Sequence, residues 1–500
     1  MSANTIRLLL LFWAAAAALA DVRLPSVLSD HMMLQRDQRV RLWGKADPGE
    51  QVTVVFRGQT VSSQTDELGR WFVFLNPASA GGPFEMEVRG KNRLSVKDVL
   101  VGDVWVGSGQ SNMVWEVRQS DNAEKEIAAA NYPQIRIFEV ALKTSDTPLD
   151  DVEGSWHVVT PQSIPSFSAV GYFFARHLHQ QLKTPIAVIQ SAWGGTPADS
   201  WTSLTALSSD PALIVSWNEW AKSLAAFPDA QIRYQQRLRE WEQAASKAKE
   251  EGKPAPAKPA APQGPGHQWA PGSLYNAMIA PLTPMAIKGV IWYQGESNTS
   301  PRRAPVYERL FETMIRDWRR AWGQGDFPFL FVQLANFGKV APDAMWPTVR
   351  NAQFRTLGLA NTGMAVTIDI GNPNDIHPTN KQDVGTRLAL AARAVAYGQK
   401  LVYSGPTFRQ AVVEGNQIRI ILDHVGSGLE AKGGELKGFR IAGPTGELVA
   451  AQARIDGNTI VVSSDTVSAP RVVAYAWENS PEANLYNSQG LPASPFKSDE

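Results

Sequence analysis

The chain of 500 residues contains no cysteine. That absence excludes disulfide bonds, cysteine nucleophiles and metal sites built from thiolates. The chain also lacks an excess of charge of either sign, because 48 basic residues stand against 48 acidic ones. Nothing in this balance would draw it to nucleic acid or to an anionic membrane. We therefore expect neither partner, and a neutral or locally recognised substrate fits the composition better.

Long apolar runs are scarce as well. The run at residues 8–19 follows Arg7 and ends in Ala18-Leu19-Ala20, which are small residues at the positions that a signal peptidase requires. We expect residues 1–20 to be a cleaved export signal, which predicts a periplasmic or secreted protein. No later stretch of about twenty apolar residues follows, so no membrane-embedded segment is expected.

Five hundred residues are too many for one ordinary core and predict about three domains. Residues 21–97 hold short β-type stretches between turn signals, which is typical of a small β-sandwich. Residues 401–500 are again rich in such stretches and predict a closing β domain. The strands expected in these two regions are 39–43, 51–56, 71–75, 417–422, 438–441, 459–463 and 471–477.

Between them, residues 98–400 alternate apolar strands with amphipathic helices, a pattern that predicts a parallel sheet covered on both faces. The strands expected here are 104–106, 186–189, 289–293, 329–334 and 364–368. An insertion at about 210–268 interrupts the alternation. Its first part, to residue 252, has a helical composition, and residues 253–266 form a Pro/Ala-rich linker expected to be extended or disordered.

Small and polar residues follow the ends of these strands. In open parallel sheets, functional loops lie beyond the carboxyl ends of the strands, so these residues are expected to form one site. They are Ser111, Gly194, Gly195, Gln294 and His377.

Ser111 is the candidate nucleophile of this site. A serine hydroxyl is a weak nucleophile at neutral pH and needs an imidazole to take its proton and a carboxylate to orient the imidazole. Met113 stands where the Gly-x-Ser-x-Gly elbow of α/β-hydrolases has its last glycine, so that elbow is not predicted. Taken alone, the segment is also compatible with an ordinary polar turn.

Asp375 and His377 are the candidate partners of the serine. Two positions apart in an extended loop, their side chains can project to the same side. The same pair is also compatible with a local hydrogen bond in a loop. A rival pair, Asp423 and His424, lies in the C-terminal β region, and the other five histidines do not follow a core strand beside a carboxylate.

An ester-cleaving site also needs donors for the developing oxyanion, each worth about 10²–10³ in rate. Gly194 and Gly195 can offer backbone N–H groups, and Gln294 or Asn298 can offer a side-chain amide. Gln294 is favoured because it lies directly at a strand end. Glu296 suggests a glycosidase acid, but that chemistry needs a second paired carboxylate, and none beyond Asp375 follows these strands.

Four segments of the chain resemble, in order and spacing, the motifs of the sialate O-acetylesterase family within the SGNH (GDSL-like) hydrolases. The resemblance continues in Ser29-Asp30-His31-Met32, in Leu34-Gln35-Arg36 and in residues 484–495, so it covers nearly the whole chain after the export signal. The four segments are Gly109-Gln110-Ser111-Asn112-Met113, Ser191-Ala192-Trp193-Gly194-Gly195-Thr196-Pro197, Trp292-Tyr293-Gln294-Gly295-Glu296-Ser297-Asn298 and Asn374-Asp375-Ile376-His377-Pro378.

The resemblance implies a three-layer α/β/α, flavodoxin-like core that removes O-acetyl groups from sugars without a metal or organic cofactor. It implies Ser111 as nucleophile, His377 as base and then acid, and Asp375 as the residue that orients His377. It further implies an oxyanion hole from the N–H groups of Ser111 and of Gly194 or Gly195. The superfamily's third block usually carries an asparagine, whereas here Gln294 or Asn298 is available.

Two other functions remain open. The family name indicates sialate, but residues of the pocket wall select the sugar, so an acetylesterase of plant polysaccharide such as xylan or xyloglucan is the alternative. A non-catalytic carbohydrate-binding protein is the alternative of another class, since indole faces stack on sugars and the chain has 17 tryptophans. The sequence leaves the oligomeric state open.

Overall fold

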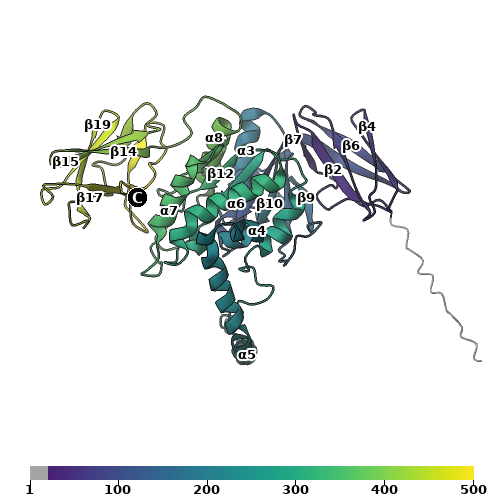
Figure 1. Ribbon diagram of the computed structural model, residues 1–500, viewed down its shortest axis with the longest axis horizontal. Helices are drawn as coiled ribbons and strands as arrows, with labels where there is room; N and C mark the ends of the chain where they lie inside the picture. Colours follow the sequence, from purple (N-terminus) through teal and green to yellow (C-terminus); the bar gives the residue numbers. More distant parts are fainter. Residues whose placement is uncertain (1–20, 500) are drawn as a thin grey trace, which may run out of the picture.

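The computed structural model describes residues 21–499 and is organised around one long strand (Figure 1). β7 (Arg93–Gly109) pairs antiparallel with β6 (Gly81–Arg89) along its first half. Along its second half it pairs parallel with β10 (Ile186–Ala192) and β11 (Gly289–Tyr293). One strand therefore belongs to both the N-terminal β region and the central sheet.

Short antiparallel strands build the N-terminal region, as the sequence predicts. β2 (Val40–Lys45) pairs with β5 (Arg70–Leu75), and β3 (Gln51–Phe56) pairs with β4 (Gln59–Gln64) and with β6. Along β5 the side chains alternate between exposed and buried positions, so one face of the strand packs into a core. The short β1 (Met33–Gln35) adds parallel to β7.

The central sheet is mostly parallel, which confirms the mixed α/β fold with additional β-rich regions. Every neighbouring pair on its main path is parallel except β8–β9. The strand order is β13 (Thr362–Ala365), β12 (Phe329–Val332), β11, β7, β10, β8 (Tyr132–Val140) and β9 (Gly154–Val159).

Two details of this sheet differ from the sequence-based expectation. β8 and β9 were not predicted, because Arg136 interrupts the apolar pattern of β8. The structure buries Arg136 and compensates its charge with Asp98, 2.8 Å away. The strand expected at 364–368 lies earlier, because β13 pairs with β12 only as far as Ala365.

Alternate residues of the central strands enter two hydrophobic clusters. Trp105, Ile291 and Leu330 belong to the cluster that contains residues of α3 (Ala169–Leu182) and α8 (Lys381–Val395). Their neighbours Val106, Val290 and Phe331 belong to the cluster that contains residues of α6 (Tyr307–Trp322) and α7 (Trp346–Arg355). The period of two along the strands thus provides both faces of the sheet with apolar side chains. Two short helices, α2 (Ala123–Ala128) and α4 (Leu204–Ser208), lie in the connections.

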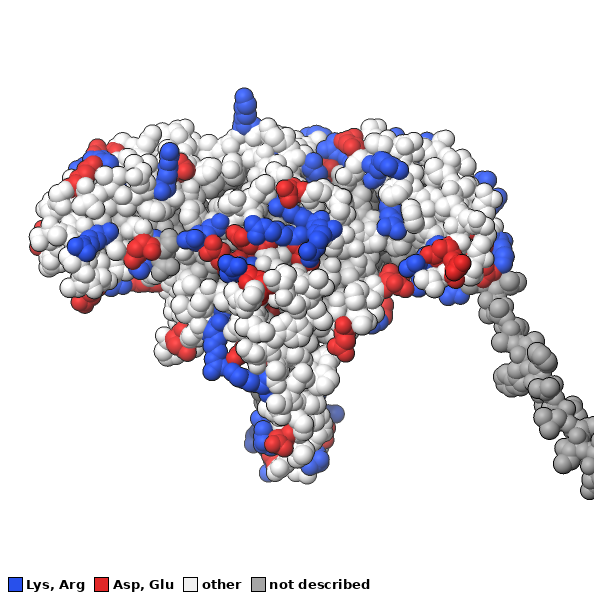
Figure 2. Space-filling model, viewed as in Figure 1, with Lys and Arg blue, Asp and Glu red and all other residues white. Residues whose placement is uncertain are grey.

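Charges of both signs lie side by side on the surface. Figure 2 shows basic and acidic side chains interspersed over the front of the central region, where Figure 1 places α6. Three arginines of α6 are paired there, Arg309 with Asp210, Arg316 with Glu312 and Arg320 with Asp317.

The insertion is dominated by α5 (Ile214–Glu250), which projects from the central region (Figure 1). Ser216 is its one fully buried residue, so most of the helix faces solvent. Residues 253–266 contain no helix or strand but lie along α5, where the indole N–H of Trp241 donates to the Pro256 carbonyl at 2.8 Å. This segment is therefore anchored to the helix rather than free of it.

The C-terminal region is a set of antiparallel sheets, and the four strands predicted there are confirmed. Two of the sheets have four strands each, in the orders β14-β15-β20-β19 and β18-β17-β21-β23. The strands are β14 (Thr407–Glu414), β15 (Gln417–Asp423), β16 (Leu429–Ala431), β17 (Phe439–Ala442), β18 (Val449–Ala450), β19 (Gln452–Asp456), β20 (Thr459–Ser463), β21 (Val472–Tyr475), β22 (Leu485–Asn487) and β23 (Phe496–Lys497).

The predicted export signal at residues 1–20 lies outside the described residues. Among residues 21–499, no helix combines the length and the apolar character that a membrane span requires.

Candidate active site

Ser111 lies at the carboxyl end of β7, where the strand turns sharply. Gly109 has φ +137°, and a Cβ atom at this position would overlap the carbonyl oxygen of Tyr293 on β11. The chain then continues into the short helix α1 (Ser111–Val114), and Gln110 N–H donates to Tyr293 O at 2.9 Å. A residue without a side chain is thus needed at Gly109 to present the serine above the sheet.

The structure brings His377 into contact with Ser111. His377 lies in the loop between β13 and α8, and its Nε2 is 2.8 Å from Ser111 Oγ. The two residues are 266 positions apart in the sequence, so only the fold joins them. In a neutral imidazole protonated at Nδ1, Nε2 accepts the serine proton, which is the arrangement a general base needs.

Asp375 is close to the imidazole but does not hydrogen bond to it. Its Oδ1 is 3.7 Å from His377 Nδ1 and instead accepts the backbone N–H of His377 at 2.9 Å. The side chain is 55% exposed. The carboxylate therefore shapes the loop directly and acts on the imidazole only through its charge in this geometry.

The surroundings of His377 favour its neutral form. Partial burial lowers the pKa of the imidazole below its usual range, and the positive charge of Lys381 lowers it further, while Asp375 opposes the shift. The indole of Trp115 lies against one face of the ring. A neutral imidazole at physiological pH is the form that can accept a proton.

A buried polar network lies beside the serine and the imidazole. Asn112 Nδ2 donates to Glu296 Oε1 at 2.7 Å and to the carbonyl of Ile376 at 3.0 Å, and Asn112 Oδ1 accepts from Lys381 Nζ at 2.6 Å. One amide thereby ties the serine helix to the histidine loop. Burial lowers the pKa of Lys381 to about 7 and raises that of Glu296.

Gly194 and Gly195 form a loop after β10 next to the serine. A Cβ atom built on Gly194 would lie 3.5 Å from Ser111 Cβ, and Gly195 has φ +70°. Within residues 21–499, the backbone N–H groups of Ser111, Gly194 and Gly195 donate to no protein acceptor. Unpaired N–H groups at this place are available to an anionic ligand atom.

Gln294 and Asn298 are fully buried and hydrogen bond to each other. Gln294 Nε2 donates to Asn298 Oδ1 at 2.7 Å and to the Thr196 carbonyl at 3.3 Å, while its Oε1 accepts from the Tyr307 hydroxyl. Asn298 Nδ2 donates to Asp199 at 3.1 Å. The amide hydrogens of Gln294 thus have acceptors that hold the loop after Gly195, and the third oxyanion donor stays a prediction.

Several residues of this site were missed by sequence reasoning. Neither Lys381 nor Trp115 belongs to a recognisable motif, although Lys381 follows His377 closely in the sequence. Trp269, directly after the insertion, donates its indole N–H to the Gly195 carbonyl at 2.7 Å. The structure also pairs His31 with Asp98 at 2.7 Å, but Arg136 shares this carboxylate, so the group is a structural ion pair.

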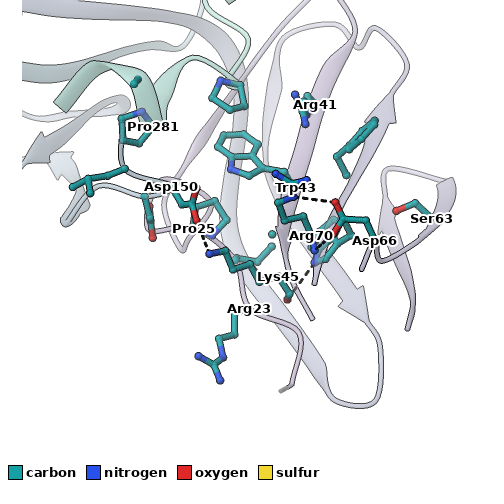
Figure 3. Close-up of a pocket in the computed structure, with 18 of the residues that line it drawn as sticks. Arg23, Pro25, Arg41, Trp43, Lys45, Ser63, Asp66, Arg70, Asp150 and Pro281 are labelled. Atoms are coloured by element: carbon teal, nitrogen blue, oxygen red, sulfur yellow. Dashed lines mark hydrogen bonds and ion pairs between the residues drawn. The ribbon is translucent and has the colours of Figure 1, made fainter. Parts of the chain in front are cut away.

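A cavity lies away from these residues. It has a volume of about 930 Å³ and lies between the N-terminal strands and the segments around Asp150 and Pro281 (Figure 3). Two of its cations are already paired, Lys45 with Asp150 at 2.6 Å and Arg70 with Asp66 at 2.9 Å. It contains none of the predicted site residues. Among residues 21–499, no group of three His, Asp or Glu side chains is arranged to hold a metal ion.

Comparison with known proteins shows which family the chain resembles. Residues 259–394 match the family model described as carbohydrate esterase, sialic acid-specific acetylesterase. The sialate O-acetylesterase of Mus musculus is 36% identical to this chain, and the match covers 80% of this chain and 78% of the mouse protein. The sialate O-acetylesterase of Pongo abelii is 31% identical, and the match covers 97% of this chain and 94% of the Pongo protein. The crystal structure of a carbohydrate acetylesterase from Xanthomonas citri matches with a TM-score of 0.82 and 40% identity, covering 96% of this chain and all of the other. The resemblance seen in the sequence motifs is confirmed.

Proposed function

The chain belongs to the sialate O-acetylesterase family and is an esterase, and from this premise we propose that it hydrolyses O-acetyl esters on carbohydrates through an acetyl-enzyme on Ser111. The observation that carries the proposal is the 2.8 Å contact between Ser111 Oγ and His377 Nε2. A hydroxyl in this contact can pass its proton to the base while its oxygen attacks an ester carbonyl.

The reaction proceeds in two steps. Ser111 Oγ attacks the acetyl carbonyl as His377 Nε2 takes its proton, and the protonated imidazole then gives that proton to the departing sugar oxygen, which leaves an acetyl ester on Ser111. In the second step, His377 takes a proton from water, the hydroxide adds to the acetyl carbonyl, and Ser111 leaves with its proton restored as acetate departs.

The developing oxyanion is stabilised by backbone donors. The unpaired N–H groups of Ser111 and of Gly194 or Gly195 support this role, since they need no reorganisation when the charge forms. Gln294 or Asn298 completes the set if an amide hydrogen is released from its present acceptor.

Asp375 acts as the orienting acid of a Ser-His-Asp triad. Its carboxylate, 3.7 Å from Nδ1, is near enough to stabilise the imidazolium by charge, and its bond to the His377 backbone fixes the loop that carries the base.

The core is that of an SGNH hydrolase, a three-layer α/β/α domain with a flavodoxin-like sheet. If β8 and β9 are treated as additions, the parallel strands β10-β7-β11-β12-β13 have the order 2-1-3-4-5 of flavodoxin-like sheets. The two apolar clusters on opposite faces support the layering. The residues that follow β7, β10 and β11 then gather at the point where the strand order reverses, where such folds bind ligands.

Two sugars are candidates, an O-acetylated sialate, after the names of the curated relatives, and a neutral plant polysaccharide such as acetylxylan or acetylated xyloglucan. Export through residues 1–20 to the periplasm or the medium is part of the proposal, since the apolar run and the small residues after it support it.

Acetate release tests the proposed function. The purified protein is incubated with O-acetylated sialic acids, acetylxylan and acetylated xyloglucan oligosaccharides, beside its Ser111→Ala and His377→Ala variants. We expect acetate from at least one substrate and almost none from either variant. A non-catalytic carbohydrate-binding protein would release no acetate, and a fluorophosphonate would not label its Ser111.

A further inference from the structure

The insertion forms a second wall beside the candidate active site. A cavity of about 250 Å³ lies between α5, the segment that follows it and the loop after β11. We call it the α5 pocket. Its lining includes Glu219, Trp220, Trp269, Ser297, Ser300 and Arg303.

The α5 pocket is joined to the residues that flank Ser111. Trp269 donates its indole N–H to the carbonyl of Gly195, in the loop that lies against the serine. Ser297 N–H donates at 3.3 Å to the side chain of Gln110, the residue directly before Ser111. Two lining residues of the pocket are therefore hydrogen bonded to residues beside Ser111.

The chemistry of the lining suits a sugar ring. Trp220 is half-buried on α5 and lines the cavity, and among residues 21–499 its indole stacks on no aromatic ring and no cation. Ser297 and Ser300 offer hydroxyl groups close by. An apolar ring face with hydroxyl partners at its edge is the combination that a pyranose, apolar on its C–H face and polar at its rim, requires.

The charges of the α5 pocket are already compensated. Arg303 is paired at 3.0 Å with the buried carboxylate of Asp199, and Glu219 is paired at 2.8 Å with Arg302 and at 3.6 Å with Lys222. A carboxylate on the ligand would meet Glu219 without finding a free cation, and it would have to compete with Asp199 for Arg303. The pocket thus favours an uncharged sugar.

We propose that the α5 pocket is the subsite that binds a neutral saccharide ring next to the acetyl group, with Trp220 as its stacking residue. This inference rests on the proposed esterase function and extends it to the substrate. The insertion is then a specificity element, because it supplies Trp220 and Glu219 while the reacting groups come from the central sheet.

Kinetics of Trp220→Ala test the proposal, with Ile232→Ala on the exposed side of the same helix as the control. The substrates are an acetylated xylo-oligosaccharide, O-acetylated sialic acid and 4-nitrophenyl acetate, which has no sugar. Loss of the stacking face should lower kcat/KM for the oligosaccharide about tenfold, mainly through KM, and should lower kcat/KM for nitrophenyl acetate much less. Ile232→Ala should resemble the wild type on all three.

A second variant tests the charge argument. Glu219→Gln removes the acid and frees Arg302 and Lys222, so the ratio of activity on acetylated sialic acid to activity on the neutral oligosaccharide should rise severalfold. A wild type that prefers acetylated sialic acid, or a Trp220→Ala variant that keeps full activity on the oligosaccharide, would overturn the subsite while leaving the esterase function intact. A wild type that releases no acetate from any sugar would overturn both.

Discussion

The imidazole of His377 lies nearly parallel to the indole of Trp115, with ring centroids 4.9 Å apart and planes inclined by 17°. The indole shields the face of the base from water. Because burial is the main cause of the lowered pKa of His377, the residue that supplies part of this burial controls the pH range in which the base is neutral.

The acid limb of kcat/KM should therefore lie below the ordinary imidazole value of about 6.5. Protonation removes the base, so activity falls only as the pH drops through the lowered pKa. Trp115→Ala admits water to the ring and should move this limb to higher pH, whereas Trp115→Phe keeps an aromatic face and should move it less. The profile is measured with 4-nitrophenyl acetate, and an unchanged limb in the alanine variant would contradict the shielding role.

Asn112 should be required for both stability and activity. Asn112→Ala leaves Glu296 and Lys381 without their buried partner and releases the Ile376 carbonyl, so it should cost about 3 kcal/mol in the free energy of unfolding. Asn112→Asp is the matched variant, since it still accepts from Lys381 but cannot donate. We expect both variants to melt at lower temperature and to lose kcat. Wild-type values of both quantities would refute the link between α1 and the histidine loop.

Asp375 should matter less than Ser111 or His377. Its carboxylate is half-exposed and 3.7 Å from Nδ1, so Asp375→Ala should lower kcat between about tenfold and a thousandfold, whereas Ser111→Ala should cost on the order of 10⁶. Steady-state rates on one acetylated substrate compare the variants directly. If Asp375→Ala lost as much activity as Ser111→Ala, the carboxylate of Asp375 would have to hydrogen bond to the imidazole of His377 during the reaction.

Gly109 should tolerate no side chain. An alanine there combines a φ of +137° with overlap of Tyr293 O, so Gly109→Ala should give little folded protein or a much lower melting temperature. Gly358, which has a negative φ and no atom near its Cβ position, is the matched control, and Gly358→Ala should fold as the wild type does. A stable Gly109→Ala variant would show that the strand end can move away from β11.

Much of the fold could be predicted because its signals are local. The alternation in β5 and the apolar runs of β10 and β11 are visible in the sequence, since burial on one or both faces imposes them. β8 could not be predicted, because the charge of Arg136 is compensated by Asp98, which is 38 positions away along the chain.

The site could be predicted only as far as its motifs reach. Ser111 and His377 follow predicted strands, and this position can be recognised in the sequence. Lys381 and Trp269 are different, because each matters through a partner that only folding supplies, Asn112 for the lysine and Gly195 for the indole. The hydrogen bonds of the Gln294 amide likewise depend on Asn298 and Thr196. The position of Gln294 at a strand end therefore could not show whether its amide hydrogens are available to a ligand.

The acetyl group itself tests the central claim most directly. The protein is mixed with 4-nitrophenyl acetate, whose good leaving group makes the acetyl-enzyme accumulate, and is then quenched in acid, digested and analysed by peptide mass spectrometry. The proposed mechanism predicts one acetyl group on Ser111 that is absent from Ser111→Ala. Acetate release by the wild type with Ser111 never acetylated, or by Ser111→Ala at a comparable rate, would contradict it.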